Sequence, residues 1–506
     1  MRALGRPLTA AILTLTTLLG YAPQPALADR SVGAPPWITR HDAAAGPVNW
    51  SPCPEDESVQ CGLMRVPVDW TAPLGPQIDV QLARSPAGDP AAKLGVLMVN
   101  PGGPGVSAVN LALDHAFFGA EVRRRFDIVG VDPRGVGRSA PILCDQGLVD
   151  AKPSPLFTTE ADYRRTEEHN RRLAEDCGGR SGPVYEHADT VSVARDLEAV
   201  RLALGEERIS FFGASYGTLL GQVYAERYPD RVRALVLDSV MDHSAGIDAF
   251  LSQTAEAAQG AFDQFVAWCA RDDKCALRGR DIRAMWAELM RRAEAGRLPD
   301  PYDPPNLLGP WELVSAAFSA FYDPQWYSFA HYIEEAYTPA PAAPSALARR
   351  AVPLLEELTP HSFPAVICQD WWLPVDGFTG YRDRLRALAA HAPQMRVSPL
   401  ALTAVAGCLG RAAAPVNPQR PIPRAAGPVL VVNSRYDPAT AYPWAQQVAR
   451  QLGPSARLLT YQGWGHVAYR HSECVSAAVD RYLLDLTLPA DGATCPAVEP
   501  KPFGVG

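Results

Sequence analysis

The sequence has few lysines and no run of basic residues. Of its 506 residues, 47 are Lys or Arg and 55 are Asp or Glu, so the formal net charge is −8. Only four positions are Lys, and the basic residues are spread along the whole chain. A phosphate backbone would therefore meet no concentrated positive surface. We expect no nucleic-acid partner.

Long apolar runs are also missing. After the N-terminus no stretch reaches the roughly 18 apolar residues that a membrane-spanning helix needs. The first 28 residues have another pattern: two arginines, a short apolar run over 8–19, and the small-residue site Ala26-Leu27-Ala28. This pattern predicts a secretory signal peptide cleaved near Ala28. We expect a secreted, extracellular protein without a membrane anchor.

Zinc-type cysteine spacing is absent, although the chain has ten cysteines. No Cys-x-x-Cys and no Cys/His cluster at zinc spacing occurs, and we expect neither a metal nor another cofactor. An even cysteine count in an exported chain instead predicts up to five disulfides. The sequence does not determine the pairing. Loop closure favours pairing neighbours along the chain: Cys53 with Cys61, Cys144 with Cys177, Cys269 with Cys275, Cys368 with Cys408, and Cys474 with Cys495.

Short apolar strands alternate with helical stretches from residue 93 onward. This alternation is typical of an α/β fold, in which a mostly parallel sheet is flanked by helices. Residues 29–93 contain alternating pieces such as Ile78–Ala83, which predict additional antiparallel strands. The parallel strands are expected at Gly95–Asn100, Asp127–Asp132, Arg208–Phe212, Val232–Asp238, Val429–Asn433 and Arg457–Tyr461.

A helical region interrupts this alternation after the fourth of these strands. Apolar residues at three- and four-residue steps predict an inserted helical cap over 243–414. Its helices are expected at Phe250–Cys269, Ile282–Arg292, Trp311–Phe321 and Ala346–Leu358. The expected domains are a signal peptide at 1–28, a core at 29–242, the cap at 243–414, a proline-rich linker at 415–428 and the rest of the core at 429–506.

The strand over 208–212 runs into Gly213-Ala214-Ser215-Tyr216-Gly217 and then into a helical stretch. A Gly-x-Ser-x-Gly turn between a strand and a helix is typical of a nucleophile elbow, in which small residues let the Ser hydroxyl project above the sheet. The alternative is a structural turn serine. We take Ser215 as the expected nucleophile.

A nucleophilic serine needs a base and an acid that orients the base, in the chain order Ser, Asp or Glu, His. Asp437 and His466 follow the fifth and sixth expected strands, at the carboxyl edge where parallel-sheet sites form. Two rivals remain. Asp238 ends the strand after the elbow, where some hydrolases keep the acid, and His471 lies five residues past His466. The expected triad is Ser215, Asp437 and His466.

Backbone N–H groups must stabilise the oxyanion of a tetrahedral intermediate. One is expected from Tyr216, directly after the nucleophile, and the other from the loop Asn100-Pro101-Gly102-Gly103-Pro104-Gly105. Glycines allow this backbone to approach a substrate closely. Gly103 is the expected second donor, and a simple turn is the alternative.

These motifs together resemble a known family. The Gly-Gly-Pro-Gly loop, the Asp-x-Arg-Gly-x-Gly-x-Ser after the second strand, the Gly-x-Ser-Tyr-Gly elbow, the Asp-Pro-x-Thr at Asp437 and the Gly-x-Gly-His ending look like an α/β-hydrolase. More narrowly, the chain resembles the secreted tripeptidyl aminopeptidases related to prolyl aminopeptidases. The Asn-Pro-Gly-Gly-Pro-Gly form, the Cys368-Gln369-Asp370-Trp371 of the cap and the Cys474 segment carry the narrower likeness.

The resemblance implies a serine exopeptidase that removes short peptides, expected to be tripeptides, from a free N-terminus. Pro101 stands where plain prolyl aminopeptidases usually carry His, which puts the release of single prolines in doubt. The partner is then a peptide or small protein whose ammonium group needs a carboxylate, and the cap offers Glu334, Glu335 and Asp370. An esterase or other hydrolase with the same triad is the alternative. The sequence does not indicate the oligomeric state.

Overall fold

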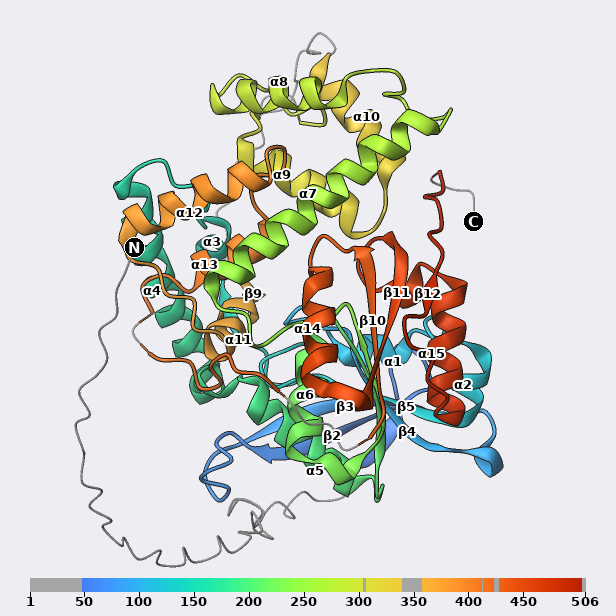
Figure 1. The fold of residues 1–506 in the computed structure, drawn as a ribbon. Helices are drawn as coiled ribbons and strands as arrows, with labels where there is room; N and C mark the ends of the chain where they lie inside the picture. Colours follow the sequence, from blue (N-terminus) through green and yellow to red (C-terminus); the bar gives the residue numbers. More distant parts are fainter. Residues whose placement is uncertain (1–47, 304–305, 339–356, 412, 423–426, 503–506) are drawn as a thin grey trace, which may run out of the picture. The chain divides into compact units, whose positions relative to one another are not determined.

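The computed structural model describes residues 48–303, 306–338, 357–411, 413–422 and 427–502. The predicted signal peptide lies outside these residues. Within them, ten strands form one sheet with the spatial order β1-β2-β3-β5-β4-β7-β8-β10-β11-β12 (Figure 1). These strands are β1 Asn49–Pro52, β2 Gln60–Pro67, β3 Gln77–Ser85, β4 Gly95–Asn100, β5 Phe126–Val131, β7 Ile209–Ala214, β8 Val232–Asp238, β10 Val429–Tyr436, β11 Ala456–Trp464 and β12 Thr494–Cys495.

The sheet changes from antiparallel to parallel at β5. Strands β1, β2, β3 and β5 pair antiparallel, whereas every neighbouring pair from β5 to β12 is parallel. The predicted strands coincide with β4, β5, β7, β8, β10 and β11 to within a few residues, and the predicted alternating piece is β3. The prediction of a mostly parallel α/β sheet is confirmed.

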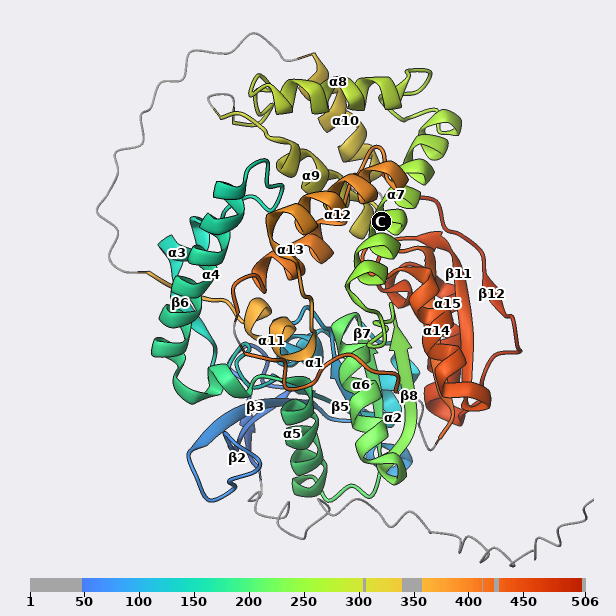
Figure 2. The same ribbon diagram turned by 60° about the vertical axis from the view of Figure 1, so that its left-hand side comes forward.

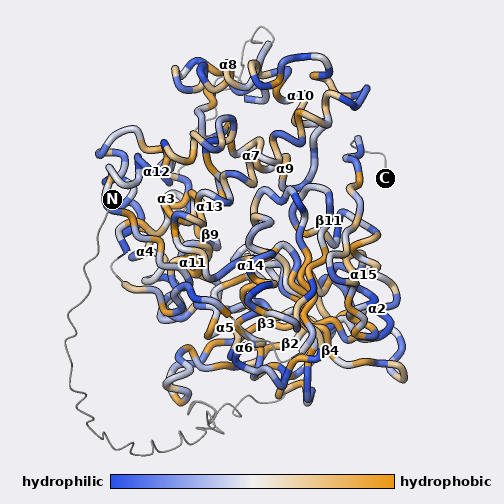
Figure 3. Tube along the Cα trace, viewed as in Figure 1, coloured by the Kyte–Doolittle hydropathy of each residue, from blue (hydrophilic) through white to orange (hydrophobic). Residues whose placement is uncertain are grey.

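Successive residues of the central strands point to two separate hydrophobic cores. Met98 and Phe211 pack into one core, and their neighbours Val99 and Phe212 pack into the other. Hydrophobic residues accordingly concentrate along these strands in Figure 3. Both faces of the sheet are therefore covered, as a parallel sheet requires. One face carries α5 Thr190–Ala203, α6 Tyr216–Arg227 and α14 Tyr442–Leu452; the other carries α1 Ala108–Leu113, α2 Ala120–Arg125 and α15 Glu473–Asp485.

The region between β8 and β10 is mainly helical. Its helices are α7 Ile247–Arg271, α8 Ile282–Glu294, α9 Pro310–Tyr322, α10 Trp326–Tyr337, α11 Phe363–Asp370, α12 Gly377–His391 and α13 Pro399–Gly407. Three of the four helices expected here match α7, α8 and α9. Most of the fourth, over 346–356, lies outside the described residues, and Leu358 begins a short strand, β9 Leu358–Pro360, instead of ending a helix.

A second segment packs with these cap helices and comes from between β5 and β7. Its strand β6, Leu143–Asp145, pairs antiparallel with β9, and it continues into α3 Gln146–Asp150 and α4 Glu160–Ser181. On α4, Asn170 Nδ2 donates to the carbonyls of Ala406 and Leu409 at 2.8 and 2.9 Å. Figure 2 shows α3, α4 and β6 beside α11, α12 and α13. The cap side of the molecule is thus built from two chain segments.

The five disulfides are Cys53–Cys61, Cys144–Cys177, Cys269–Cys275, Cys368–Cys408 and Cys474–Cys495. The pairing of neighbouring cysteines is therefore confirmed. Each bridge closes a loop of at most 40 residues within one part of the fold. No helix among the described residues is long and apolar enough to cross a membrane.

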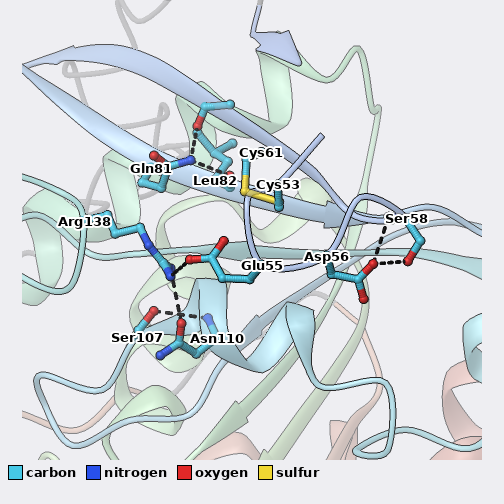
Figure 4. Close-up of a disulfide and its surroundings, with 11 residues drawn as sticks. Cys53, Glu55, Asp56, Ser58, Cys61, Gln81, Leu82, Ser107, Asn110 and Arg138 are labelled. Atoms are coloured by element: carbon cyan, nitrogen blue, oxygen red, sulfur yellow. Dashed lines mark hydrogen bonds and ion pairs between the residues drawn. A yellow bond between two sulfur atoms is a disulfide. The ribbon is translucent and has the colours of Figure 1, made fainter. Parts of the chain in front are cut away.

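The first disulfide lies next to contacts that hold the end of the glycine-rich loop (Figure 4). Arg138 donates to Glu55 Oε1 at 2.6 Å, beside Cys53–Cys61, and to Asn110 Oδ1 on α1 at 3.2 Å. Ser107 Oγ accepts from the Asn110 N–H at 3.1 Å and so caps α1. These contacts fix the point where the loop after β4 enters its helix.

Candidate active site

Ser215 sits in the turn between β7 and α6 with an unusual backbone conformation. Its φ is +57° and ψ is −127°, a region that non-glycine residues rarely adopt. A Cβ on Gly217 would come within 2.4 Å of the Asn100 carbonyl oxygen, which explains why that position of the turn is glycine. The predicted strand, turn and helix are all present. Ser215 is 5% exposed.

Asp437 and His466 form a buried hydrogen-bonded pair. The His466 Nδ1 lies 3.0 and 2.9 Å from the two carboxylate oxygens of Asp437, and neither side chain is exposed. Burial alone would raise the pKa of Asp437. The imidazole and the N–H groups of Ala439 and Thr440 outweigh burial, so that the pKa is lowered. With Nδ1 donating to the carboxylate, Nε2 is the ring nitrogen that faces away from Asp437.

Thr440 supports the carboxylate from the same loop. Its N–H donates to Asp437 Oδ1 at 3.0 Å and its hydroxyl donates to Oδ2 at 2.8 Å. These bonds leave the oxygens of Asp437 facing the imidazole in one orientation. Thr440 is the last residue of the Asp-Pro-x-Thr motif. In the sequence, only its spacing of three residues from Asp437, which favours a local hydroxyl hydrogen bond, indicated this role.

The catalytic proton transfer would need a contact between Ser215 Oγ and His466 Nε2. In the described structure no hydrogen bond joins these atoms, and the buried Nε2 has no partner. The two loops nevertheless converge on one residue. The Ser215 N–H donates to the backbone carbonyl of Asp238 at 2.9 Å, and the Asp238 carboxylate accepts from the loop that follows His466. The unpaired ring nitrogen of His466 therefore belongs to a loop that is tied to Ser215 through Asp238.

Among the described residues, the Asp238 carboxylate makes no hydrogen bond to the His466 ring, and His471 makes none to Asp437. Asp238 Oδ1 and Oδ2 accept from the N–H groups of Ala468 and Tyr469 at 3.0 and 2.8 Å. Burial raises the pKa of Asp238 to about 7, despite these two hydrogen bonds. His471 Nε2 bonds the His466 carbonyl at 3.0 Å. Both rivals thus make hydrogen bonds to the backbone of the loop that carries His466.

The glycine-rich loop lies against the elbow. A Cβ placed on Gly102 would come within 2.8 Å of the Tyr216 backbone nitrogen and 2.9 Å of Ser215 Cβ. The Gly102 N–H is already bonded to Asn100 Oδ1 at 3.0 Å. Gly103, at φ +106°, has no recorded partner for its N–H within the described residues. Tyr216 is the first residue of α6, where an N–H has no intrahelical acceptor. Both expected donors are thus unengaged.

The cap reaches the base through the end of α9. The His466 N–H donates to the Tyr322 carbonyl at 2.8 Å, and the two rings lie 4.4 Å apart between centroids. Next to them, Trp326 at the start of α10 lies over Trp464 at the end of β11, with ring centroids 4.6 Å apart. Sequence periodicity gave no signal for the Tyr322 contact, because the two residues are 144 positions apart.

The three candidate amine-binding carboxylates lie in different surroundings. Asp370 is fully buried and accepts from Thr190, Asn417 and the Tyr216 hydroxyl. Burial, with Asp189 nearby, raises its pKa to about 7 against these hydrogen bonds. Glu334 lies 3.8 Å from Arg280, and Glu335 is exposed on the same helix, α10. Asp370 alone contacts a residue of the elbow.

Comparisons with known proteins agree with this geometry. A family model described as alpha/beta hydrolase fold matches residues 95–470. A protein named tripeptidyl aminopeptidase from Streptomyces lividans is 34% identical over 493 residues, which cover 91% of this chain and 89% of that protein. Serine protease Hip1 of Mycobacterium tuberculosis is 32% identical, with 89% of this chain and 91% of that protein covered. A protein named carboxylesterase B, also from Mycobacterium tuberculosis, is 33% identical, with 97% and 98% covered.

Proposed function

The chain is a serine hydrolase that belongs to the alpha/beta hydrolase fold family, and we propose that it is an exopeptidase releasing short peptides, expected to be tripeptides, from free N-termini. The observation that carries the proposal is the buried Asp437–His466 pair, whose histidine loop is tied through Asp238 to the Ser215 elbow. Acyl transfer through serine requires a base oriented by an acid, and this pair supports both roles.

In the proposed reaction Ser215 Oγ attacks the scissile carbonyl while His466 Nε2 takes its proton. The N–H groups of Gly103 and Tyr216 stabilise the resulting oxyanion. His466 then gives the proton to the leaving amine, and the released peptide's carboxyl stays on Ser215 as an ester. Water, deprotonated by His466, hydrolyses this acyl-enzyme and regenerates the serine. In this proposal the contact between Oγ and Nε2 closes when substrate binds, as catalytic hydrogen bonds often do.

The relatives named tripeptidyl aminopeptidase and serine protease support a peptide substrate. Glu334 and Glu335 lie on α10 and are partly or largely exposed, whereas Asp370 is buried and already accepts hydrogen bonds from Thr190, Asn417 and Tyr216. We therefore favour Glu334 and its neighbour Glu335 over the saturated Asp370 as direct partners of the ammonium.

A panel of chromogenic substrates tests the exopeptidase. Mono-, di- and tripeptidyl derivatives would be compared with free and acetylated N-termini. The proposal expects the free tripeptidyl derivative to have the highest kcat/KM, and acetylation to lower kcat/KM at least about tenfold through loss of the charged contact. E334Q and E335Q should lose this discrimination, singly or together. Equal cleavage of free and acetylated substrates would contradict the proposed function.

An esterase is the second candidate, because one relative is named carboxylesterase B. An esterase needs an apolar acyl pocket and no ammonium partner. Simple acyl esters would then be hydrolysed faster than any free tripeptidyl derivative, and E334Q and E335Q would leave both rates unchanged. The same substrate panel therefore separates the two functions.

Export is also part of the proposal. The five disulfides need an oxidising compartment, and the N-terminal pattern predicts cleavage after Ala28. N-terminal sequencing of protein collected from culture medium should begin at Asp29. Protein found only inside the cell, with its N-terminus intact, would contradict export.

A further inference from the structure

Three consecutive residues at the end of β8 contact every loop that carries a member of the proposed triad. These residues, Asp238, Ser239 and Val240, are fully buried. Asp238 ends β8, where it pairs with Ala214 of β7 on one side and with Val432 of β10 on the other, and Ser239 and Val240 follow it. Their place in the sheet puts them between the nucleophile and the acid.

The first set of contacts goes to the nucleophile. The Asp238 carbonyl accepts from the Ser215 N–H at 2.9 Å. Met241, directly after these residues, donates its N–H to the Thr218 hydroxyl at 2.9 Å, and that hydroxyl donates to the Ser215 carbonyl at 2.6 Å. Both backbone polar groups of Ser215 are thus linked to the segment after β8. The strained φ of Ser215 is held from both sides of the residue.

The second set goes to the histidine loop. Three consecutive N–H groups of this loop, those of Val467, Ala468 and Tyr469, meet three side-chain oxygens. Ser239 Oγ accepts from Val467 at 2.7 Å, and the two Asp238 oxygens accept from the other two at 3.0 and 2.8 Å. Val467 is left-handed, with φ +66°. A β-branched residue in this conformation is strained, so the loop needs such contacts to keep its shape.

The third set goes to the acid loop. The Val240 N–H donates to Asn433 Oδ1 at 2.7 Å, and Asn433 Nδ2 donates to the Thr440 carbonyl at 3.1 Å. Thr440 in turn donates twice to Asp437. The acid loop is therefore connected to the same three residues through one buried amide side chain.

On the basis of the proposed serine mechanism, we propose that Asp238 and Ser239 are positioning residues that hold Ser215 and His466 in register through the end of β8. Asp238 acts on both sides at once, because its carbonyl binds the nucleophile and its carboxylate binds the histidine loop. It does not replace Asp437, since both of its oxygens are engaged by backbone N–H groups. Losing the carboxylate would let the imidazole move relative to the hydroxyl without changing either group.

The test measures how fast a fluorophosphonate labels the purified protein, together with kcat and KM on a reporter substrate. Labelling needs the serine and its base but does not depend on the preferred acyl group. D238N keeps the size of the side chain but turns an NH2 group toward a backbone N–H. S239A removes one acceptor. D127N is the matched control, because Asp127 is also buried and accepts from the Ala87 N–H at 2.9 Å. Asp127 lies at the start of β5, whereas Asp238 lies at the end of β8.

We expect D238N to slow labelling and lower kcat about 30- to 100-fold, with KM changed by less than about threefold, because misplacing reacting groups by about 1 Å can cost about 100-fold in rate. S239A should show a smaller loss of the same kind, and D127N should label at the wild-type rate. All variants would be compared well below their melting temperatures. If both variants are folded, slower labelling and lower kcat in D238N but not in D127N indicate a positioning role for Asp238.

Folded D238N and S239A that label and turn over at wild-type rates would overturn the inference. If D238N does not melt cooperatively, S239A alone decides it. Failure of the proposed function has a different signature: S215A would label as fast as the wild type. If instead only the substrate class is wrong, wild-type labelling stays intact and the comparison of D238N with D127N still stands.

Discussion

The two sides of His466 are held by different kinds of contact. On the core side, its ring bonds Asp437 and its loop bonds Asp238 and Ser239, all through buried hydrogen bonds. On the cap side, Tyr322 offers one backbone carbonyl and the face of a ring, and its side chain is 37% exposed. Directional bonds fix the position of an atom, whereas ring packing tolerates displacement. On the proposed mechanism, we therefore expect the core to determine the chemistry and the cap to affect substrate binding.

Breaking the core side should have the largest effect. D437N keeps the shape of the acid but removes the charge that selects the Nδ1-protonated imidazole. We expect kcat to fall about 10⁴-fold, as the loss of a triad acid does in general. Steady-state kinetics on the best reporter substrate would measure this loss. If the kcat of D437N stayed within tenfold of the wild type, another residue would have to be the acid, and Asp238 would be the first to test.

Removing one disulfide from the core and, separately, one from the cap compares the two sides by their free energy of unfolding and by kcat. Replacing Cys474 and Cys495 by Ser opens a loop of 21 residues beside the histidine loop, and we expect a cost of about 3 kcal/mol, against about 2 kcal/mol for Cys269 and Cys275 in the cap. The core pair should also lower kcat, because α15 follows the loop of His466. The cap pair should leave kcat unchanged. Chemical denaturation and kinetics would measure both, and equal kcat losses would contradict the division.

Changing Tyr322 should have a smaller and different effect. Y322A removes the ring over His466 but leaves the backbone carbonyl that binds the His466 N–H. We expect kcat/KM for the tripeptidyl substrate to change about tenfold, or about 1.4 kcal/mol, and mainly through KM. Y322F, which keeps the ring, should stay close to the wild type. A large loss of kcat in Y322A with KM unchanged would mean that the cap also positions the base.

A further prediction concerns the pH dependence of stability on the cap side. Folded Asp370 has a pKa of about 7, whereas an unfolded Asp ionises near pH 4. Between these values the folded state binds more protons, so the free energy of unfolding falls as pH rises, by at most about 1.4 kcal/mol per pH unit for this group. Its contribution is fully present below pH 4 and lost above pH 7.

D370N should remove this part of the pH dependence. Denaturation at pH 5, 6 and 7 would show a shallower decline of the unfolding free energy for the variant than for the wild type. The difference between the two unfolding free energies should therefore change with pH, by at most about 1.4 kcal/mol for each pH unit. Parallel curves would show that Asp370 is ionised in the folded protein throughout this range, with its hydrogen bonds from Thr190 and Asn417 outweighing burial.

The sequence predicted the parts of the fold that local patterns determine. Continuous apolar runs predicted the parallel strands, and the glycines of the elbow marked Ser215, because close backbone approach leaves a local requirement in the sequence. The disulfide pairing followed from short loops. The pairing of β6 with β9, and the packing of α4 with the cap, could not be predicted, because those contacts join segments more than 200 residues apart and leave no periodicity.

The same limit applies to the candidate site. Asp437 and His466 could be placed at strand ends from sequence alone, because chain order and the parallel sheet bring such ends together. The contacts of Asp238 are made with N–H groups 230 positions later, and a backbone donor has no residue type to reveal it. Sequence analysis could therefore treat Asp238 only as a rival acid, and it assigned no role to Tyr322.

The most direct test of the central claim is to identify the residue that a fluorophosphonate modifies. The purified protein would be labelled, digested and analysed by peptide mass spectrometry, alongside S215A and H466A. The account predicts a single adduct on Ser215 that is absent in S215A and forms far more slowly in H466A. An adduct on another residue, or undiminished labelling of S215A, would contradict it.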